Sequence, residues 1–192
     1  VHGELAGQTI QTHPVFETTW ATWKKIAPNS QVVSTNTGYS RSYGTYPYGD
    51  YRTNHNNLIF PVSDRDGRLP AKQRVLGVLL ANTTKAYPIA AFGNGVSLIQ
   101  ESLDNTAVVI AGSEEHNFAV AFERQVNGQV LSFEALNDQL PLIMKDEAGN
   151  TWNIWGQAVD GPNKGATLKP LNSYIAYWFA WAAFWPGTDL SK

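Results

Sequence analysis

The chain has 192 residues, of which 43% are hydrophobic, 12% aromatic and only 16% charged, with a formal net charge of −2 and no cysteine. The scattered lysines and arginines give no electrostatic footprint for nucleic acid, and no apolar run reaches the roughly 18 residues of a transmembrane segment. The missing thiols exclude disulfides, thiolate metal sites and a cysteine nucleophile within this chain.

The first predicted helix spans residues 16–27. Trp20 and Trp23 lie three residues apart, so they share one helical face, and Pro28 ends the helix. Indoles at this spacing are typical of core anchors rather than of a ligand stack. A short strand is predicted directly afterwards, at residues 31–34.

Residues 36–57, here called the tyrosine loop, are rich in Gly, Ser, Asn and Tyr and show no periodicity. Loops of this length are usually functional or disordered, and the many tyrosines argue against disorder. Rigid amphipathic rings beside charged side chains are typical of sugar, peptide and protein contact surfaces. The alternative is that the loop packs across the body and buries its own rings, and the two roles are compatible. The candidate ligand-binding residues are Tyr39, Arg41, Tyr43, Tyr46, Tyr48, Asp50, Tyr51 and Arg52.

A mainly β region follows, with short strands about ten residues apart. Asn127-Gly128 between two apolar runs gives the strongest hairpin signal. This spacing predicts an antiparallel barrel or a sandwich-like body of the mainly β (α+β) class, closed by a helix at residues 173–184. The predicted strands are residues 74–80, 84–90, 96–103, 107–111, 118–124, 130–135, 142–146 and 151–155.

The two ends of the chain resemble each other at a constant offset of 158. Residues 1–32 align without a gap to residues 159–190, and Trp20 and Trp23 pair with Trp178 and Trp181. We interpret this as an internal repeat that relates two short helices. The predicted organisation is a tail of a preceding repeat at residues 1–33, the tyrosine loop and a linker at 34–73, and the β body with its closing helix at 74–192.

Several motif-like strings follow one another along the chain: residues 37–41, 48–51, 60–62, 68–70, 74–78, 85–88 and 177–184, followed by Pro186. In this order they resemble the uncharacterised prokaryotic family catalogued as domain of unknown function 3179. Family members resemble a two-copy protein whose first copy carries a histidine-containing and a Cys-x-x-Cys-like segment, and this chain resembles the C-terminal part. The matching segments here, residues 93–100 and 107–116, hold no cysteine, so thiol or metal chemistry of the first copy does not carry over.

Familiar catalytic signatures are absent: the chain has no nucleophile elbow, phosphate-binding glycine loop or zinc-binding His-Glu-x-x-His helix. The histidines also lack metal-ligand spacing. His116 with Glu114 forms the most polar local cluster and is the candidate metal site, since a carboxylate can orient an imidazole. A solvated turn explains the same residues. No cofactor is predicted, and whether a divalent metal binds stays open.

The sequence therefore favours an uncharacterised extracytoplasmic structural or binding module over an enzyme. The alternative is a metal-binding protein or hydrolase-like enzyme with its site around His116 and the tyrosine loop. The sequence opens with Val and without a positively charged, apolar leader, so we expect either a leader that has been removed or an arbitrary start. Many Asn, Thr, Tyr and Trp with few charges are also common in secreted proteins. The first helix is expected either to dock on the β body or to mediate self-association or a protein contact through its indoles.

Overall fold

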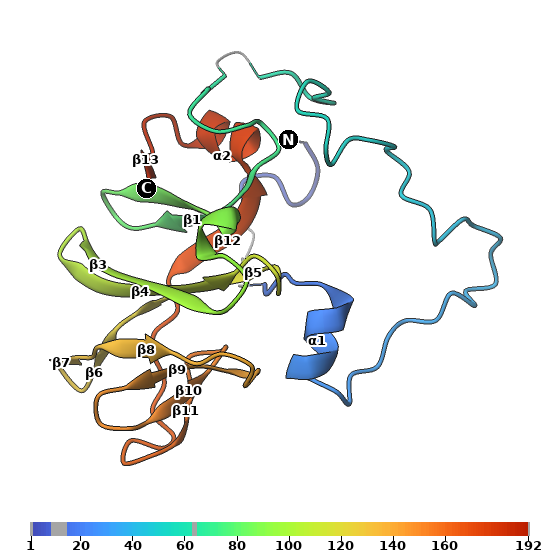
Figure 1. The fold of residues 1–192 in the computed structure, drawn as a ribbon. Helices are drawn as coiled ribbons and strands as arrows, with labels where there is room; N and C mark the ends of the chain where they lie inside the picture. Colours follow the sequence, from blue (N-terminus) through green and yellow to red (C-terminus); the bar gives the residue numbers. More distant parts are fainter. Residues whose placement is uncertain (1, 9–14, 63–64, 192) are drawn as a thin grey trace.

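The computed structural model describes residues 2–8, 15–62 and 65–191. Three small sheets are stacked in layers, with one helix over the outermost sheet and the other beside the body (Figure 1). The elements are α1 (Trp20–Ile26), β1 (Arg74–Leu79), β2 (Thr84–Pro88), the 3₁₀ turn η1 (Ile89–Phe92), β3 (Ser97–Leu103), β4 (Thr106–Ser113), β5 (Phe118–Glu123), β6 (Gln125–Val126), β7 (Gln129–Val130), β8 (Phe133–Ala135), β9 (Leu142–Asp146), β10 (Thr151–Asn153), β11 (Ala158–Asp160), β12 (Asn172–Tyr177), α2 (Trp178–Phe184) and β13 (Asp189–Leu190).

The sheets are antiparallel except at one edge. The first has the order β12-β1-β2-β13, in which β13 runs parallel to β2. The second is β3-β4-β5 and the third is β11-β10-β9-β8. No sheet among the described residues closes into a barrel, so of the two predicted architectures the sandwich-like body is the one observed.

The central strands are apolar on both faces because each lies between two layers. In β1, Val75 packs with α2, whereas Leu76 and Val78 face the second sheet. In β4, Ile110 faces the first sheet and Val109 the third. Successive side chains of a strand point to opposite faces, so two-sided burial requires a continuous apolar run in place of alternation.

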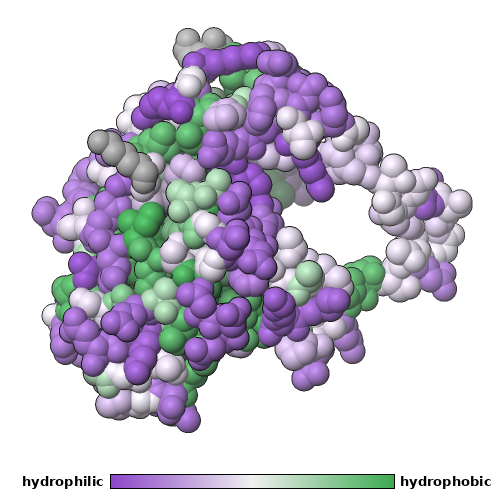
Figure 2. Space-filling view, in the orientation of Figure 1, coloured by the Kyte–Doolittle hydropathy of each residue, from purple (hydrophilic) through white to green (hydrophobic). Residues whose placement is uncertain are grey.

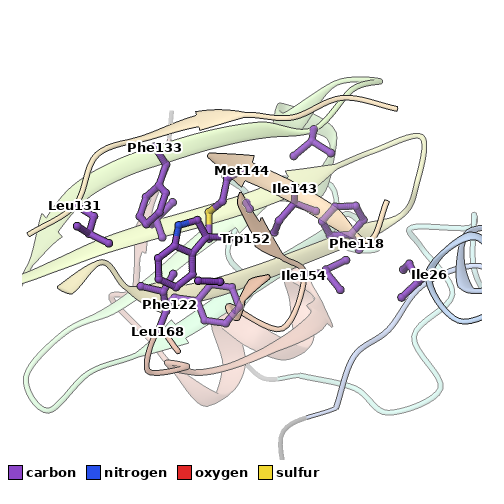
Figure 3. Packing of buried hydrophobic residues seen from close by; sticks show 14 residues of the cluster. Ile26, Phe118, Phe122, Leu131, Phe133, Ile143, Met144, Trp152, Ile154 and Leu168 are labelled. Carbon is purple, nitrogen blue, oxygen red and sulfur yellow. The ribbon is translucent and has the colours of Figure 1, made fainter. Parts of the chain in front are cut away.

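The largest cluster fills the space between the second and third sheets. Trp152 is fully buried there, edge-on to Phe133 with the ring centroids 5.8 Å apart, and Phe118 and Phe122 contribute from β5 (Figure 3). The indole N–H of Trp152 donates to the buried carboxylate of Asp146 at 3.0 Å. The third sheet is thereby anchored by apolar packing and by a satisfied buried polar group.

The hairpin predicted at Asn127-Gly128 is confirmed, and a second hairpin has the same turn chemistry. Asn127 (φ 51°) and Gly128 (φ 81°) join β6 to β7, and Asp104 and Asn105 join β3 to β4 with both φ angles positive. Positive φ at both central positions gives a turn whose twist matches the flanking strands.

Four of the predicted elements are wrong in type or extent. The first helix begins at Trp20 instead of residue 16, because the Thr19 side chain accepts from the Thr22 N–H and caps it. The closing helix begins at Trp178, since residues 172–177 form β12 and pair with β1. Residues 31–34 are exposed and form no strand. The predicted strand at 130–135 is divided between β7 and β8.

The paired tryptophans have different environments. Trp178 and Trp181 are fully buried, as expected of core anchors, whereas Trp23 is half-buried and Trp20 is 48% exposed. The core-anchor prediction is therefore wrong for Trp20. The helix α1 nevertheless docks on the body, because Ile26 joins the largest core cluster and the Phe16 ring lies 6.0 Å from that of Phe118.

The described parts of the two terminal segments share their local geometry at the offset of 158. Both helices have seven residues, begin 158 positions apart and follow an extended capping residue. Trp23 Nε1 donates to Ser30 Oγ at 2.8 Å, and Trp181 Nε1 donates to Thr188 Oγ1 at 3.1 Å. Turns at residues 3–7 and 161–165 also correspond, with Ala6 N–H donating to Gly3 O as Lys164 N–H does to Gly161 O.

No helix in the described ranges is both long and apolar enough to cross a bilayer.

A side chain at Gly77 is expected to unseat α2. A Cβ at this position of β1 would overlap the six-membered ring of Trp181, and overpacking a tight core contact typically costs about 1–3 kcal/mol. Gly77→Ala should therefore lower the free energy of unfolding in urea by about that amount. Gly67→Ala is the matched control, because a Cβ there meets no atom within 4 Å; equal stability of the two variants would contradict the argument.

Candidate functional site

The tyrosine loop returns to the body through a row of aromatic rings. Tyr46 contacts Tyr48 at a centroid distance of 5.6 Å, Tyr48 contacts Tyr51 at 6.4 Å, and Tyr51 lies edge-on to Tyr177 at 6.3 Å. Tyr177 is the last residue of β12 and stacks on Phe179 at 6.2 Å. The rings thus join the second half of the loop to the β12–α2 junction.

A buried lysine lies at the end of this row. The Lys72 ammonium is 2.9 Å from the Tyr51 ring centroid, 5.4 Å from that of Tyr177 and 5.0 Å from that of Phe179. Lys72 is almost completely buried, and its Nζ has no hydrogen-bond partner among the described residues. The three ring faces therefore provide the main electrostatic compensation for the desolvated charge, and they form what we call the lysine cage.

Two polar contacts hold the loop in the same place. The backbone N–H of Lys72 donates to His55 Nδ1 at 3.0 Å, which requires an unprotonated nitrogen at that position. Asp50 accepts from the side-chain amides of Asn54 and Asn57, and these hydrogen bonds lower the pKa of the Asp50 carboxyl. Asp50 thus organises the turn that carries Tyr51.

An open cleft of about 600 Å³ lies between the loop, β12 and the extended residues before α1. Two guanidinium groups line it. Arg52 stacks on Tyr46, with its Cζ 4.1 Å from the ring centroid, and has no hydrogen bond among the described residues. Arg74 donates to Glu17 Oε1 at 2.6 Å and to Asn117 Oδ1. One arginine is therefore held by ionic and polar partners, and the other is available to a ligand.

The Tyr177 hydroxyl also belongs to this cleft. Burial raises the pKa of Tyr177, and its tyrosine neighbours act in the same direction, while Arg52 and Arg74 lower it in part. The cleft can consequently offer an anionic or polar ligand the guanidinium of Arg52, part of the guanidinium of Arg74, a neutral phenol donor and the Tyr46 ring.

The structure brings together part of the predicted ligand-binding set. Tyr46 and Arg52 line the cleft, and Tyr48, Asp50 and Tyr51 support it. The other three predicted residues lie away from it. Tyr39 is 72% exposed, and the Tyr43 hydroxyl forms a hydrogen bond with Thr37 within the loop. Among the described residues, Arg41 donates only to the carbonyl of Ser40.

Sequence reasoning missed the contributing residues that lie outside the tyrosine loop. They are Glu17, Lys72, Arg74, Asn117 and Tyr177. Arg74 and Tyr177 are each the first residue of a family-like string, at residues 74–78 and 177–184, and this is the one signal that could have identified them.

The candidate metal residues lie in the turn between β4 and β5. Glu114 is exposed, and the His116 carbonyl accepts from Thr18 Oγ1 at 2.6 Å. Within the described ranges, no group of three His, Asp or Glu side chains could hold a metal ion. His116 and Glu114 therefore lack a third protein ligand there, and metal binding stays a prediction.

The fold and the cleft together define a small, mainly β, cysteine-free module of sandwich-like architecture. A family model described as "Protein of unknown function (DUF3179)" matches residues 1–188, and the chain belongs to this family. No curated protein and no solved structure matches the chain.

Removing the Tyr51 ring is expected to release the tyrosine loop. Tyr51→Ala deletes contacts to Tyr48, Tyr177 and Lys72 and leaves the buried ammonium exposed to water, so the free energy of unfolding should fall by about 1–2 kcal/mol. Limited proteolysis within residues 36–57 should accelerate. Tyr39→Ala is the matched control and should change neither quantity; equal protease sensitivity in both variants would contradict the cage as the anchor.

Alkaline pH should weaken the folded chain in part through Tyr177. Burial raises the pKa of Tyr177 in the folded chain above the ordinary phenol value of 10.0. As pH rises, the unfolded chain therefore loses the Tyr177 proton before the folded chain does. The contribution of Tyr177 to the free energy of unfolding is consequently complete below pH 10 and declines above it. Tyr177→Phe should make the fall in unfolding free energy above pH 10 shallower. Urea titrations across that range measure how steeply the unfolding free energy falls with pH, and Tyr39→Phe is the control. A slope unchanged in Tyr177→Phe as well as in the control would reject the prediction.

Proposed function

We propose that this chain is a non-catalytic, extracytoplasmic binding module, and that it binds a small carboxylate-bearing ligand such as an acidic sugar. The observation that carries the proposal is the convergence of Arg52, Arg74, Tyr46 and the Tyr177 hydroxyl on one cleft of about 600 Å³. A guanidinium pairs with a carboxylate through two parallel hydrogen bonds, and an aromatic face packs against a sugar ring or another planar group.

The charge arrangement favours a ligand with a single compact anionic group. Glu17 already occupies part of Arg74 at 2.6 Å, so the cleft holds one compensated and one uncompensated guanidinium. A polyanion would meet the Glu17 carboxylate, and the scattered positive charge of the chain offers no extended track for it.

The extracytoplasmic location is proposed on composition. Only 16% of the residues are charged, and Asn, Thr, Tyr and Trp are frequent, a composition common in secreted proteins. The location can be tested by fusing the complete gene to two reporters, one active only in the periplasm and one active only in the cytoplasm. Activity of the cytoplasmic reporter alone would reject an extracytoplasmic location.

Binding is tested with a matched pair of probes that differ by one carboxylate. Glucuronate should shift the NMR signals of the Tyr46 and Tyr177 rings, whereas glucose should shift them far less. Arg52→Ala should weaken glucuronate binding by about tenfold, equivalent to ~1.4 kcal/mol. Arg41→Ala, outside the cleft, should leave it unchanged. Equal response to the two sugars, or equal effects of the two arginine variants, would reject the carboxylate site.

A further inference from the structure

The two terminal helices have similar backbone geometry but bury different faces. In α2, Trp178, Trp181 and Ala182 point into the first sheet, where Trp181 covers Gly77. The indole N–H of Trp178 is satisfied by the carbonyl of Asp66 at 2.9 Å. These contacts hold the strand–helix element of residues 172–188 on the first sheet.

In α1 the corresponding face is turned outward. The buried residues are Thr22 and Ile26, which lie roughly a third of a helical turn away from the Trp20–Trp23 face. Trp20 is 48% exposed although its counterpart Trp178 is fully buried, and the Lys24 ammonium lies 6.0 Å from its ring. Trp23 is already fixed by its bond to Ser30, as Trp181 is by its bond to Thr188.

We propose that residues 15–30 are a second copy of the β12–α2 element, and that their Trp20–Trp23 face docks on the first sheet of a second copy of this chain when the indoles of that copy's own α2 no longer cover it. The docking surface must provide the same groups that α2 uses in this chain. It must supply a glycine beneath Trp23 and a carbonyl acceptor for the Trp20 N–H, as Gly77 and Asp66 do for α2.

One difference between the copies sets the specificity. Lys24 stands where α2 has the buried Ala182, so the partner must leave an open rim or place a carboxylate at that point. The segment can bridge two bodies, because its attachment to this chain uses other atoms. Thr18 donates to the His116 carbonyl, Glu17 pairs with Arg74, and Ile26 enters the core of this body.

The direct test uses the full chain carrying Trp178→Ala and Trp181→Ala as the acceptor probe, since its first sheet has lost its own indoles. Mixed with the unaltered chain, it should form a heterodimer detectable by light scattering, and exchange of the Trp20 indole N–H should slow at least tenfold. Trp20→Ala in the donor should abolish the heterodimer, whereas Val130→Ala, an exposed substitution elsewhere, should not. An acceptor that stays monomeric beside the donor would overturn the proposal.

A helix graft keeps the proposal falsifiable if the acceptor probe does not fold. The full chain receives the α1 sequence in place of α2, with β12 unaltered. The graft should unfold cooperatively with the Trp181 indole N–H still slow to exchange, and adding Trp181→Ala to it should remove both properties. A graft that is unfolded, or folded with that indole exposed, would show that the α1 sequence does not fit such a sheet. The substitutions are Phe179→Ala, Ala180→Thr, Ala182→Lys, Ala183→Lys and Phe184→Ile.

Discussion

The seating of Trp181 on Gly77 is the contact on which the rest of the arrangement depends. The absence of a side chain at Gly77 lets the indole lie against β1, where Val75 and Ala86 complete the cluster. This fixes α2 over the first sheet and therefore fixes the point where β12 ends. Tyr177 and Phe179 lie on either side of that point, and they are the rings that receive the tyrosine loop. The position of the candidate site thus follows from a packing contact on the opposite side of β1.

The tyrosine loop is positioned by aromatic and cationic contacts instead of by backbone pairing. Residues 36–57 form no helix or strand, and the loop extends away from the body, leaving an opening that is visible in Figure 2. Its first half makes local hydrogen bonds, whereas its second half contacts the lysine cage and the cleft. A buried ammonium is costly unless it is compensated. The burial of Lys72 is therefore stable only while the Tyr51 ring lies over its ammonium. The order of this loop and the shape of the cleft consequently depend on the same contacts.

The β body could be predicted from the sequence because its signals are local. Asn127-Gly128 specifies a turn by its positive φ angles, and the apolar runs of β1 and β4 indicate strands buried on both faces. The type of the segment at residues 172–177 could not be obtained this way, since its pairing with β1 is a contact across about a hundred residues. For the same reason the sequence offered Tyr46 and Arg52 as candidates but not Arg74, Asn117 and Tyr177, which line the same cleft. These reach the cleft from three separate strands or turns, and no spacing rule joins them.

The two indole-bearing helices show how little of a helix's orientation is encoded within the helix. Thr19 and Tyr177 adopt nearly the same capping geometry, and Trp23 and Trp181 make equivalent bonds to a hydroxyl seven residues later. Their surroundings differ, however, because α2 meets a sheet with a glycine at the contact, whereas α1 meets the edge of the body near Phe118. A strand–helix element that folds locally in the same way can thus close one sheet and cap the side of a body, and the exposed fraction of Trp20 follows from which surface is available.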